Sequence, residues 1–210
     1  MTEGIQETQS ESLALIIGLG NPGKEHALHR HNVGFMVVDA LAQAHGLRFI
    51  RKGEARAWVA QGQILDRAVL LAKPQTFMNL SGRAVHRLSQ IYRVPPEQIL
   101  VVCDDLDLPL GRLRLRPTGG SGGHKGLQSI LESLGTRSFP RLRVGIDRPP
   151  GSMDPADYVL QPFEMDQRPL LLEAIQRAVT VVECWLTEGI AAAMDRFNRA
   201  VCPQSAGERM

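Results

Sequence analysis

Short strand-like runs alternate with helix-like runs along most of this chain of 210 residues, and this alternation is the strongest constraint on its fold. The strand-like runs are Leu13–Ile17, Ala57–Ile64, Ala68–Leu71, Ile99–Cys103, Arg112–Arg116 and Leu142–Ile146. Helical spacing of apolar residues between them predicts helices over Val33–Ala44, Ser81–Arg93, Gly126–Leu134 and Gln167–Leu186. The pattern predicts a single globular α/β domain, with a mixed, mostly parallel twisted sheet and helices on both faces.

Composition at the two ends sets the expected limits of this domain. Residues 1–12 are polar and acidic and predict a disordered tail, whereas residues 13–200 contain all the expected elements. Residues 201–210 are expected to form a frayed C-terminal tail. The stretch Pro149–Pro162 is rich in proline, aspartate and glycine, and it is expected to form a mobile surface loop or a lid.

Composition also argues against several classes of protein. The sequence contains no apolar run of about 18 residues, so no membrane span is expected, and the first dozen residues lack the apolar core of a signal peptide. The three cysteines, Cys103, Cys184 and Cys202, form no Cys-x-x-Cys pair, which argues against a disulfide framework or a zinc site. We therefore expect a cytoplasmic protein that is a monomer without an obligate protein partner.

The loop after the first strand-like run carries two groups that suit ester or amide chemistry. Asn21 and His31 both lie in this loop, where a rigid strand ends. The Gly-x-Gly-x-x-Gly spacing of residues 18–23 also fits a dinucleotide fingerprint. However, helical periodicity begins only at about Asn32, too late for a helix N-terminus to hold a pyrophosphate. A nucleotide site is therefore not expected, and glycines that only let the chain turn are the alternative.

Polar side chains follow three other strand-like runs: Asn79, Asp104 and His124. The carboxyl ends of neighbouring parallel strands meet at one edge of a sheet, so these side chains are expected to converge with those of the first loop. Each one alone has a structural alternative, because Asn79 and His124 can cap helices and Asp104 can serve in a turn. Their joint placement favours a functional site.

Two further motifs suggest chemistry that other features contradict. Gly119-Gly-Ser-Gly-Gly123 fits the spacing of a nucleophile elbow, but no histidine follows His124, so the chain order of a serine triad is broken. His26, His29 and His31 are close enough in sequence to bind a metal ion. No cysteine lies near them, and a site without metal is favoured, with a metal site as the open alternative.

Residues 112–148 contain eight basic and two acidic residues, although the net charge of the whole chain is only +2. The arginines of Arg112–Arg116 alternate with leucines, and Arg141 and Arg143 flank a leucine in the same way, so each set shares one face of its strand. Two arginine-faced strands beside a glycine-rich loop favour a phosphate clamp over simple solvated charges. The aromatic content of 5% argues against broad stacking on bases.

Six short motifs contain most of these residues. They are Gly18-Leu-Gly-Asn-Pro-Gly23, Arg30-His-Asn-x-Gly34, Phe77-Met-Asn-Leu-Ser-Gly82, Asp104-x-Leu-Asp-Leu-Pro109, Gly122-Gly-His-x-Gly-Leu127 and Arg141-Leu-Arg-x-Gly-Ile146. In this order, over most of the chain, they resemble the bacterial-type peptidyl-tRNA hydrolase family. The resemblance implies a single α/β domain that cleaves the ester joining a peptide to the 3′ ribose of tRNA, without a metal or organic cofactor.

The resemblance also implies roles for the residues around the expected crevice. His31 is expected to act as the general base on water, because a histidine side chain titrates near neutral pH. Asp104 is expected to orient the imidazole and to stabilise its cation. Asn21 is expected to position the substrate, and Asn79 to donate a hydrogen bond to the carbonyl oxygen.

The peptidyl-tRNA itself is expected to bind through its acceptor end and its phosphates. The residues expected to contact it are His26, Phe77, Met78, Asn79, His124, Lys125, Arg116 and Arg143. Two of them depart from the family pattern, which usually has tyrosine in place of His26 and asparagine in place of Lys125. A lysine can donate but cannot accept a hydrogen bond, so Lys125 is expected to exchange a backbone contact for a phosphate contact.

Two other functions remain as alternatives. A non-catalytic RNA-binding protein on the same scaffold is favoured by the arginine-faced strands and by Lys125. A metallohydrolase is favoured by the three histidines of the first loop. The candidate pair of His31 and Asp104 argues against the first alternative, because a protein that only binds RNA needs no base.

Overall fold

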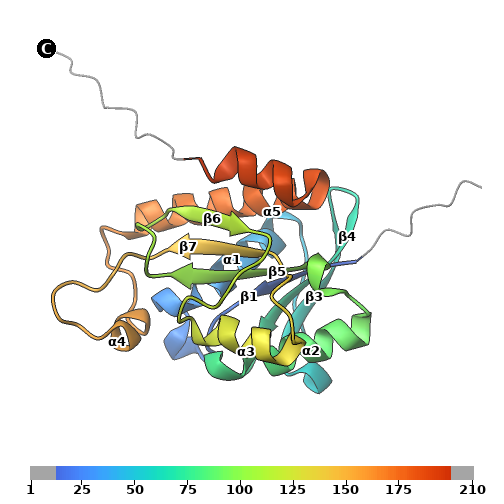
Figure 1. The fold of residues 1–210 in the computed structure, drawn as a ribbon, viewed down its shortest axis with the longest axis horizontal. Helices are drawn as coiled ribbons and strands as arrows, with labels where there is room; N and C mark the ends of the chain where they lie inside the picture. Colours follow the sequence, from blue (N-terminus) through green and yellow to red (C-terminus); the bar gives the residue numbers. More distant parts are fainter. Residues whose placement is uncertain (1–12, 200–210) are drawn as a thin grey trace, which may run out of the picture.

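Seven strands form one mixed sheet in the computed structural model, which describes residues 13–199 (Figure 1). The predicted tails, residues 1–12 and 201–210, lie outside the described residues. The strands are β1 (Ala14–Gly18), β2 (Ile50–Lys52), β3 (Ala57–Ile64), β4 (Arg67–Pro74), β5 (Ile99–Asp105), β6 (Leu113–Arg116) and β7 (Arg141–Gly145). Their order across the sheet is β2-β3-β4-β1-β5-β7-β6.

The parallel part of the sheet is confined to its centre. Strands β4, β1, β5 and β7 run parallel to one another, whereas β2, β3 and β6 join by antiparallel pairing. The predicted mixed sheet is confirmed: four of its seven strands run parallel to one another, and three of its six pairings are antiparallel. The carboxyl ends of the four central strands therefore share one edge, while the carboxyl end of β6 points to the opposite edge.

Helices cover both faces of the sheet, as the sequence predicts (Figure 1). Helices α1 (Val33–Ala44) and α5 (Arg168–Phe197) pack on one face, and α2 (Ser81–Tyr92) and α3 (Lys125–Leu134) pack on the other. Strand β1 lies between the two cores, and its successive side chains point into them alternately. This placement explains why the first strand-like run is apolar at every position.

Three elements differ from the sequence prediction. The three-residue strand β2 was not expected, and it pairs only with β3 at the edge of the sheet. Helix α5 continues past Leu186, although its backbone leaves the helical conformation at Gly189 (φ 82°, ψ 176°). The predicted loop Pro149–Pro162 contains helix α4 (Pro155–Val159), whose first turn is capped by the Asp154 side chain. No helix within residues 13–199 is long and apolar enough to cross a bilayer.

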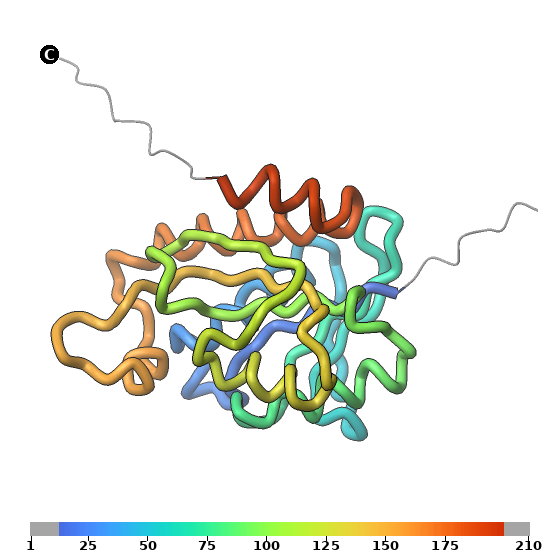
Figure 2. The backbone as a smooth tube through the Cα atoms, in the orientation of Figure 1, coloured from blue at the N-terminus to red at the C-terminus, as the bar shows by residue number. Residues whose placement is uncertain are grey.

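The segment between β7 and α5 forms a lobe at one end of the molecule (Figure 2). It is held in place by hydrogen bonds within the segment and by hydrogen bonds to the rest of the domain. The buried Tyr158 hydroxyl donates to the carbonyl of Ile146 (2.9 Å), and the backbone N–H of Arg30 donates to the carbonyl of Gln161 (2.9 Å). The segment is therefore packed against the domain, and its predicted mobility stays a prediction.

Candidate active site

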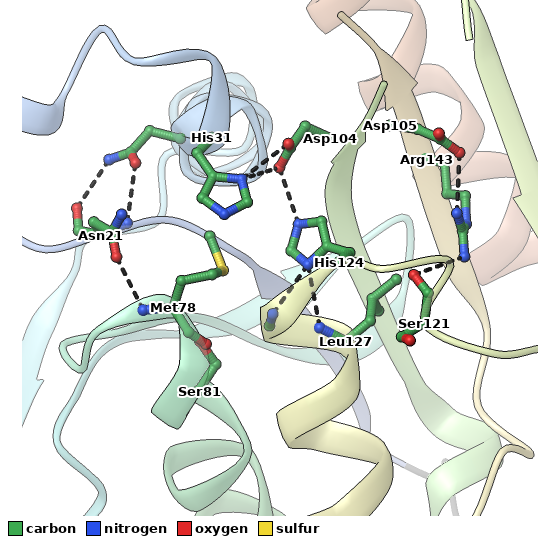
Figure 3. Close-up of polar contacts among 12 residues, drawn as sticks. Asn21, His31, Met78, Ser81, Asp104, Asp105, Ser121, His124, Leu127 and Arg143 are labelled. Atoms are coloured by element: carbon green, nitrogen blue, oxygen red, sulfur yellow. Dashed lines mark hydrogen bonds and ion pairs between the residues drawn. The ribbon is translucent and has the colours of Figure 1, made fainter. Parts of the chain in front are cut away.

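The carboxyl ends of β4, β1 and β5 place three loops side by side at one edge of the sheet. Asp104 lies at the end of β5, and the loop after β1 carries Asn21 and His31. Met78 follows β4 and begins a short 3-10 helix, η4 (Met78–Leu80). Figure 3 shows the side chains of Asn21, His31, Met78 and Asp104 around one space. The structure thus brings together the three residues that the sequence predicts to be catalytic.

His31 and Asp104 form a buried pair. Nδ1 of His31 lies 2.9 Å from both carboxylate oxygens of Asp104, and the two residues are 8% and 3% exposed. A carboxylate accepts hydrogen bonds, so Nδ1 of His31 carries the proton and donates it. Figure 3 shows the other ring nitrogen, Nε2, turned away from Asp104 toward the open space. This nitrogen therefore keeps a lone pair that can accept a proton.

His124 also contacts Asp104, but its second nitrogen is already occupied. Nδ1 of His124 accepts hydrogen bonds from the backbone N–H groups of Gly126 (3.1 Å) and Leu127 (3.2 Å) at the start of α3. Two donors at Nδ1 require a lone pair there, so the proton lies on Nε2, which donates to Oδ1 of Asp104 (3.0 Å). His124 therefore has the tautomer opposite to that of His31.

The route that brings His124 to this edge differs from the predicted one. Strand β6 runs antiparallel to β7, and its last residue, Arg116, pairs with Arg141 near the opposite edge of the sheet. The glycine-rich loop of residues 117–124 then returns along the sheet to Asp104. His124 thus reaches the site as the N-cap of α3, so both its predicted structural role and its predicted place in the site are present.

The two imidazoles keep Asp104 ionised although it is buried. Burial alone would raise the pKa of this carboxyl group. The hydrogen bonds that His31 and His124 donate, together with the positive charge that each ring carries when it is protonated, outweigh this cost and hold the pKa of Asp104 well below its usual range. A carboxylate that stays negative can stabilise a positive charge on His31 after proton uptake.

Hydrogen bonds to the backbone of Asn21 and to its side-chain oxygen, Oδ1, hold this residue in place. Its N–H donates to Oδ1 of Asn32 (3.0 Å), and its carbonyl accepts from Nδ2 of the same residue (2.9 Å). Oδ1 of Asn21 accepts from the N–H of Met78 (2.9 Å), which fixes the orientation of the amide. The Nδ2 group is left as a donor near His31 (Figure 3). The bracing role of Asn32 was not predicted, because it depends on a contact across the loop.

The other predicted substrate-binding residues lie around the rim. Met78 is buried beside the pair, whereas Phe77 is 66% exposed. Asn79 and Lys125 line a groove of about 330 Å³ that runs along the start of α3. Asn79 is therefore placed for a substrate in this groove, and no hydrogen bond joins its side chain to Asn21, His31 or Asp104.

The predicted phosphate clamp is wrong for Arg141. This residue is 1% exposed, and its guanidinium lies 4.2 Å from the centre of the Phe139 ring. It donates to the carbonyls of Gly119 (2.6 Å), Gly120 (3.2 Å) and Arg137 (3.2 Å). Burial lowers the pKa of Arg141 to about 10, so it remains charged at neutral pH while holding the glycine-rich loop.

Arg143 and Arg116 are more accessible, and they differ from each other. Arg143 pairs with Oδ2 of Asp105 (3.0 Å) and donates to the carbonyl of Gly120 (3.1 Å). Through strand pairing it lies level with Cys103, next to Asp104. Arg116 is exposed on β6 and, because it pairs with Arg141, lies two register positions farther from the site than Arg143.

Arg30 is a buried residue whose role the sequence did not reveal. Its guanidinium donates to the carbonyl of Pro162 and to Oε1 of Gln167 (2.8 Å). It also lies over the rings of Tyr158 (4.2 Å) and Phe163 (5.2 Å). Arg30 directly precedes the candidate base, so it ties the position of that base to the lobe. All of these partners lie more than 120 residues away in sequence, which is why no local pattern predicted the contact.

The three histidines of the first loop do not form one cluster. His26 and His29 face each other on the rim, with their Nδ1 atoms 3.4 Å apart, whereas His31 points inward to Asp104. A different trio, His31, Asp104 and His124, has nitrogen and oxygen atoms within 4.8 Å of one another. A metal there would need Nε2 of His124 while its Nδ1 accepts two N–H groups, which requires an imidazolate. This donor set therefore fits proton sharing better than metal binding.

The site contains an imidazole with a free nitrogen, a buried carboxylate that orients it, and an amide donor beside it. These groups are typical of a hydrolase that activates water. The comparisons with known proteins agree with this class. Residues 15–205 match the family model described as peptidyl-tRNA hydrolase. A peptidyl-tRNA hydrolase of Chloroflexus aggregans is 51% identical over 185 residues, which cover 88% of this chain and 98% of the relative. One of Roseiflexus castenholzii is 53% identical, with 88% and 86% covered.

A solved structure gives the same result. The crystal structure of the peptidyl-tRNA hydrolase from Acinetobacter baumannii superposes with a TM-score of 0.84 at 36% identity, covering 90% of this chain and 95% of that one. The chain therefore belongs to the peptidyl-tRNA hydrolase family, and the predicted family resemblance is confirmed.

Proposed function

We propose that this protein hydrolyses the ester between a peptide and the 3′ ribose of tRNA, with His31 as the general base. The observation that carries the proposal is the buried His31–Asp104 pair, which leaves Nε2 of His31 free beside Asn21. Family membership supplies the substrate class. An ester is already activated, so the reaction needs no covalent serine or cysteine.

The proton transfers follow from the two tautomers. Nε2 of His31 takes a proton from water as the water oxygen attacks the ester carbonyl, and the resulting imidazolium is stabilised by Asp104. The same proton then passes to the 3′ oxygen of the ribose as the ester bond breaks. The products are a tRNA with a free 3′ hydroxyl and a peptide carboxylic acid, which releases its proton to water to become the carboxylate. A positioned base of this kind contributes roughly 10²–10⁴ in rate.

The remaining residues are proposed to bind the substrate. Nδ2 of Asn21 is a donor for a peptide or ester carbonyl, and the exposed Phe77 offers an apolar surface to the peptide. Asn79 and Lys125 would hold the acceptor end in their groove, while Arg143 and Arg116 would contact phosphates. We further propose that His26 lies close to the tRNA end, and that residues 13–200 act as a monomer in the cytoplasm.

The proposal is tested by comparing an N-acetylated aminoacyl-tRNA with the free aminoacyl-tRNA. We expect purified wild-type protein to release tRNA from the blocked substrate and to leave the free one largely intact. Turnover is expected to persist in excess chelator, because no proposed step uses a metal ion. Light scattering in solution checks the proposed monomer.

The second candidate is a protein that binds RNA without cleaving it, which the exposed arginines favour. The free Nε2 of His31 argues against this alternative. Normal binding of tRNA by the wild-type protein with no ester turnover would establish it and refute the hydrolase.

A further inference from the structure

The rim pair of His26 and His29 has a geometry that the proposed reaction does not explain. The two Nδ1 atoms face each other at 3.4 Å, and the rings meet at 65°. Hydrogen bonds with a nitrogen donor are normally about 2.7–3.2 Å long, so this contact is a weak one. A hydrogen bond alone therefore does not explain why the two Nδ1 atoms lie 3.4 Å apart.

A shared metal ion accounts for this distance. Zinc–imidazole bonds are about 2.0–2.1 Å long, and two of them at a tetrahedral angle separate their nitrogens by about 3.3 Å. The geometry points to a binding site for one borderline transition-metal ion, such as Zn²⁺ or Ni²⁺, between Nδ1 of His26 and Nδ1 of His29. Imidazole ligands select this class of ion over Mg²⁺ and Ca²⁺, which prefer oxygen.

The backbone holds both ligands in place. His26 ends the 3-10 helix η1 (Lys24–His26), and its carbonyl accepts from the N–H of His29 (2.9 Å). His29 also forms a bridge with Pro162 of the lobe. This hydrogen bond closes a turn from His26 to His29, and the two rings meet across it with their centres 4.9 Å apart. Little reorganisation is needed when an ion binds.

Glu25 supports the required tautomer of His26. Its Oε1 atom lies 3.6 Å from Nε2 of His26, too far for a hydrogen bond, but its negative charge favours the proton on that side of the ring and so a lone pair on Nδ1. The His26 side chain is 29% exposed, so an ion can enter from solvent. The two histidines occupy two tetrahedral positions, and water or another small ligand completes the coordination.

This site is distinct from the centre around Asp104. At that centre, both nitrogens of His124 are engaged and His31 has only Nε2 free. His26 and His29 instead place two Nδ1 atoms 3.4 Å apart, close to the separation of two ligands on one tetrahedral ion. The metal site is independent of the proposed hydrolase activity, because metal binding is measured without any substrate.

The test is calorimetric titration of the full, tag-free, chelator-treated protein with NiCl₂ and with ZnCl₂. We expect one ion per chain, and a Kd at least about tenfold weaker in H26A and in H29A, a change of about 1.4 kcal/mol. H86A is the matched control, because His86 is exposed on α2 away from the pair, and its Kd should equal that of the wild type. E25Q should weaken binding less than either histidine variant.

Electron paramagnetic resonance of the Cu²⁺ complex gives an independent readout. The wild-type spectrum should show coupling to two imidazole nitrogens, and the H29A spectrum should show one. An unchanged Kd in both H26A and H29A would overturn the inference. So would loss of binding in H31N with binding retained in H26A, because that result assigns the ion to the Asp104 centre.

Discussion

The Asp104 centre and the arginines of β6 and β7 are both rich in polar groups, yet they differ in what remains free. Around Asp104, hydrogen bonds hold the side chains of His31, His124 and Asn21 in place. They leave Nε2 of His31 and Nδ2 of Asn21 without a partner among residues 13–199. On β7, Arg141 donates hydrogen bonds to backbone carbonyls. Arg143 pairs with Asp105 and donates to a carbonyl of the glycine-rich loop. A residue type suggests chemistry, but its unoccupied atoms decide whether that chemistry is available.

The largest expected effect follows from removing the free nitrogen, Nε2 of His31, while the rest of the Asp104 centre is kept. H31Q removes the proton acceptor, and we expect kcat to fall by about 10²–10⁴. Substrate affinity should change little, because the imidazole is proposed to act on water. Single-turnover release of tRNA from N-acetylated aminoacyl-tRNA measures the effect, with H86A as the control. Wild-type turnover by H31Q would show that the free nitrogen of the Asp104 centre is not used in the reaction.

The ionised state of Asp104 predicts how stability depends on pH. Its folded pKa lies below the ordinary value of about 3.9, so the unfolded chain takes up the proton first as the pH falls. The stabilisation is therefore present above about pH 4 and is lost as the pH falls toward the folded pKa. Urea unfolding of the wild type and of D104N between about pH 2.5 and 6 should show a steeper loss in the wild type. Parallel curves for the two proteins would contradict it.

Arg141 and Arg143 give the sharpest contrast within one strand. R141Q leaves buried carbonyls without donors, and we expect a decrease of about 1–3 kcal/mol in the free energy of unfolding. R143Q acts at a more exposed position and should destabilise the fold less. Chemical denaturation of both variants measures the difference. Equal decreases would show that Arg143 has the same structural role as Arg141.

The smallest effect concerns the binding of phosphate. R116Q should weaken tRNA binding, because the variant neutralises fewer phosphates. The slope of log K against log salt should become shallower by about 0.7 for each phosphate left without its arginine on a single strand, or by about 0.9 on a duplex. The kcat at saturating substrate should stay unchanged. Binding measured between about 50 and 200 mM salt tests this expectation. A wild-type slope in R116Q would place the phosphate elsewhere.

The sequence predicted the parts of the molecule that local patterns determine. The bounds of α1 and β3 match the structure, because apolar spacing sets them within one segment. Asn21, His31 and Asp104 were predicted to meet, because the ends of central parallel strands share an edge.

Interactions between distant segments explain what the sequence did not predict. Arg141 was expected to face a phosphate, but its partners are carbonyls of a loop about 20 residues away that folds back over it. The packing of the lobe depends on Arg30, whose partners are more than 120 residues away. The tautomer of His124 depends on the start of α3, which no pattern of residue types reveals.

The opposite tautomers of His31 and His124 are the central claim, because they leave one imidazole free as a base and hold the other as a support. Long-range ¹H–¹⁵N correlation spectra of histidine-labelled protein at neutral pH measure them directly. We predict a neutral His31 protonated on Nδ1 and a neutral His124 protonated on Nε2. A His31 protonated on Nε2, or the same tautomer in both rings, would contradict the account.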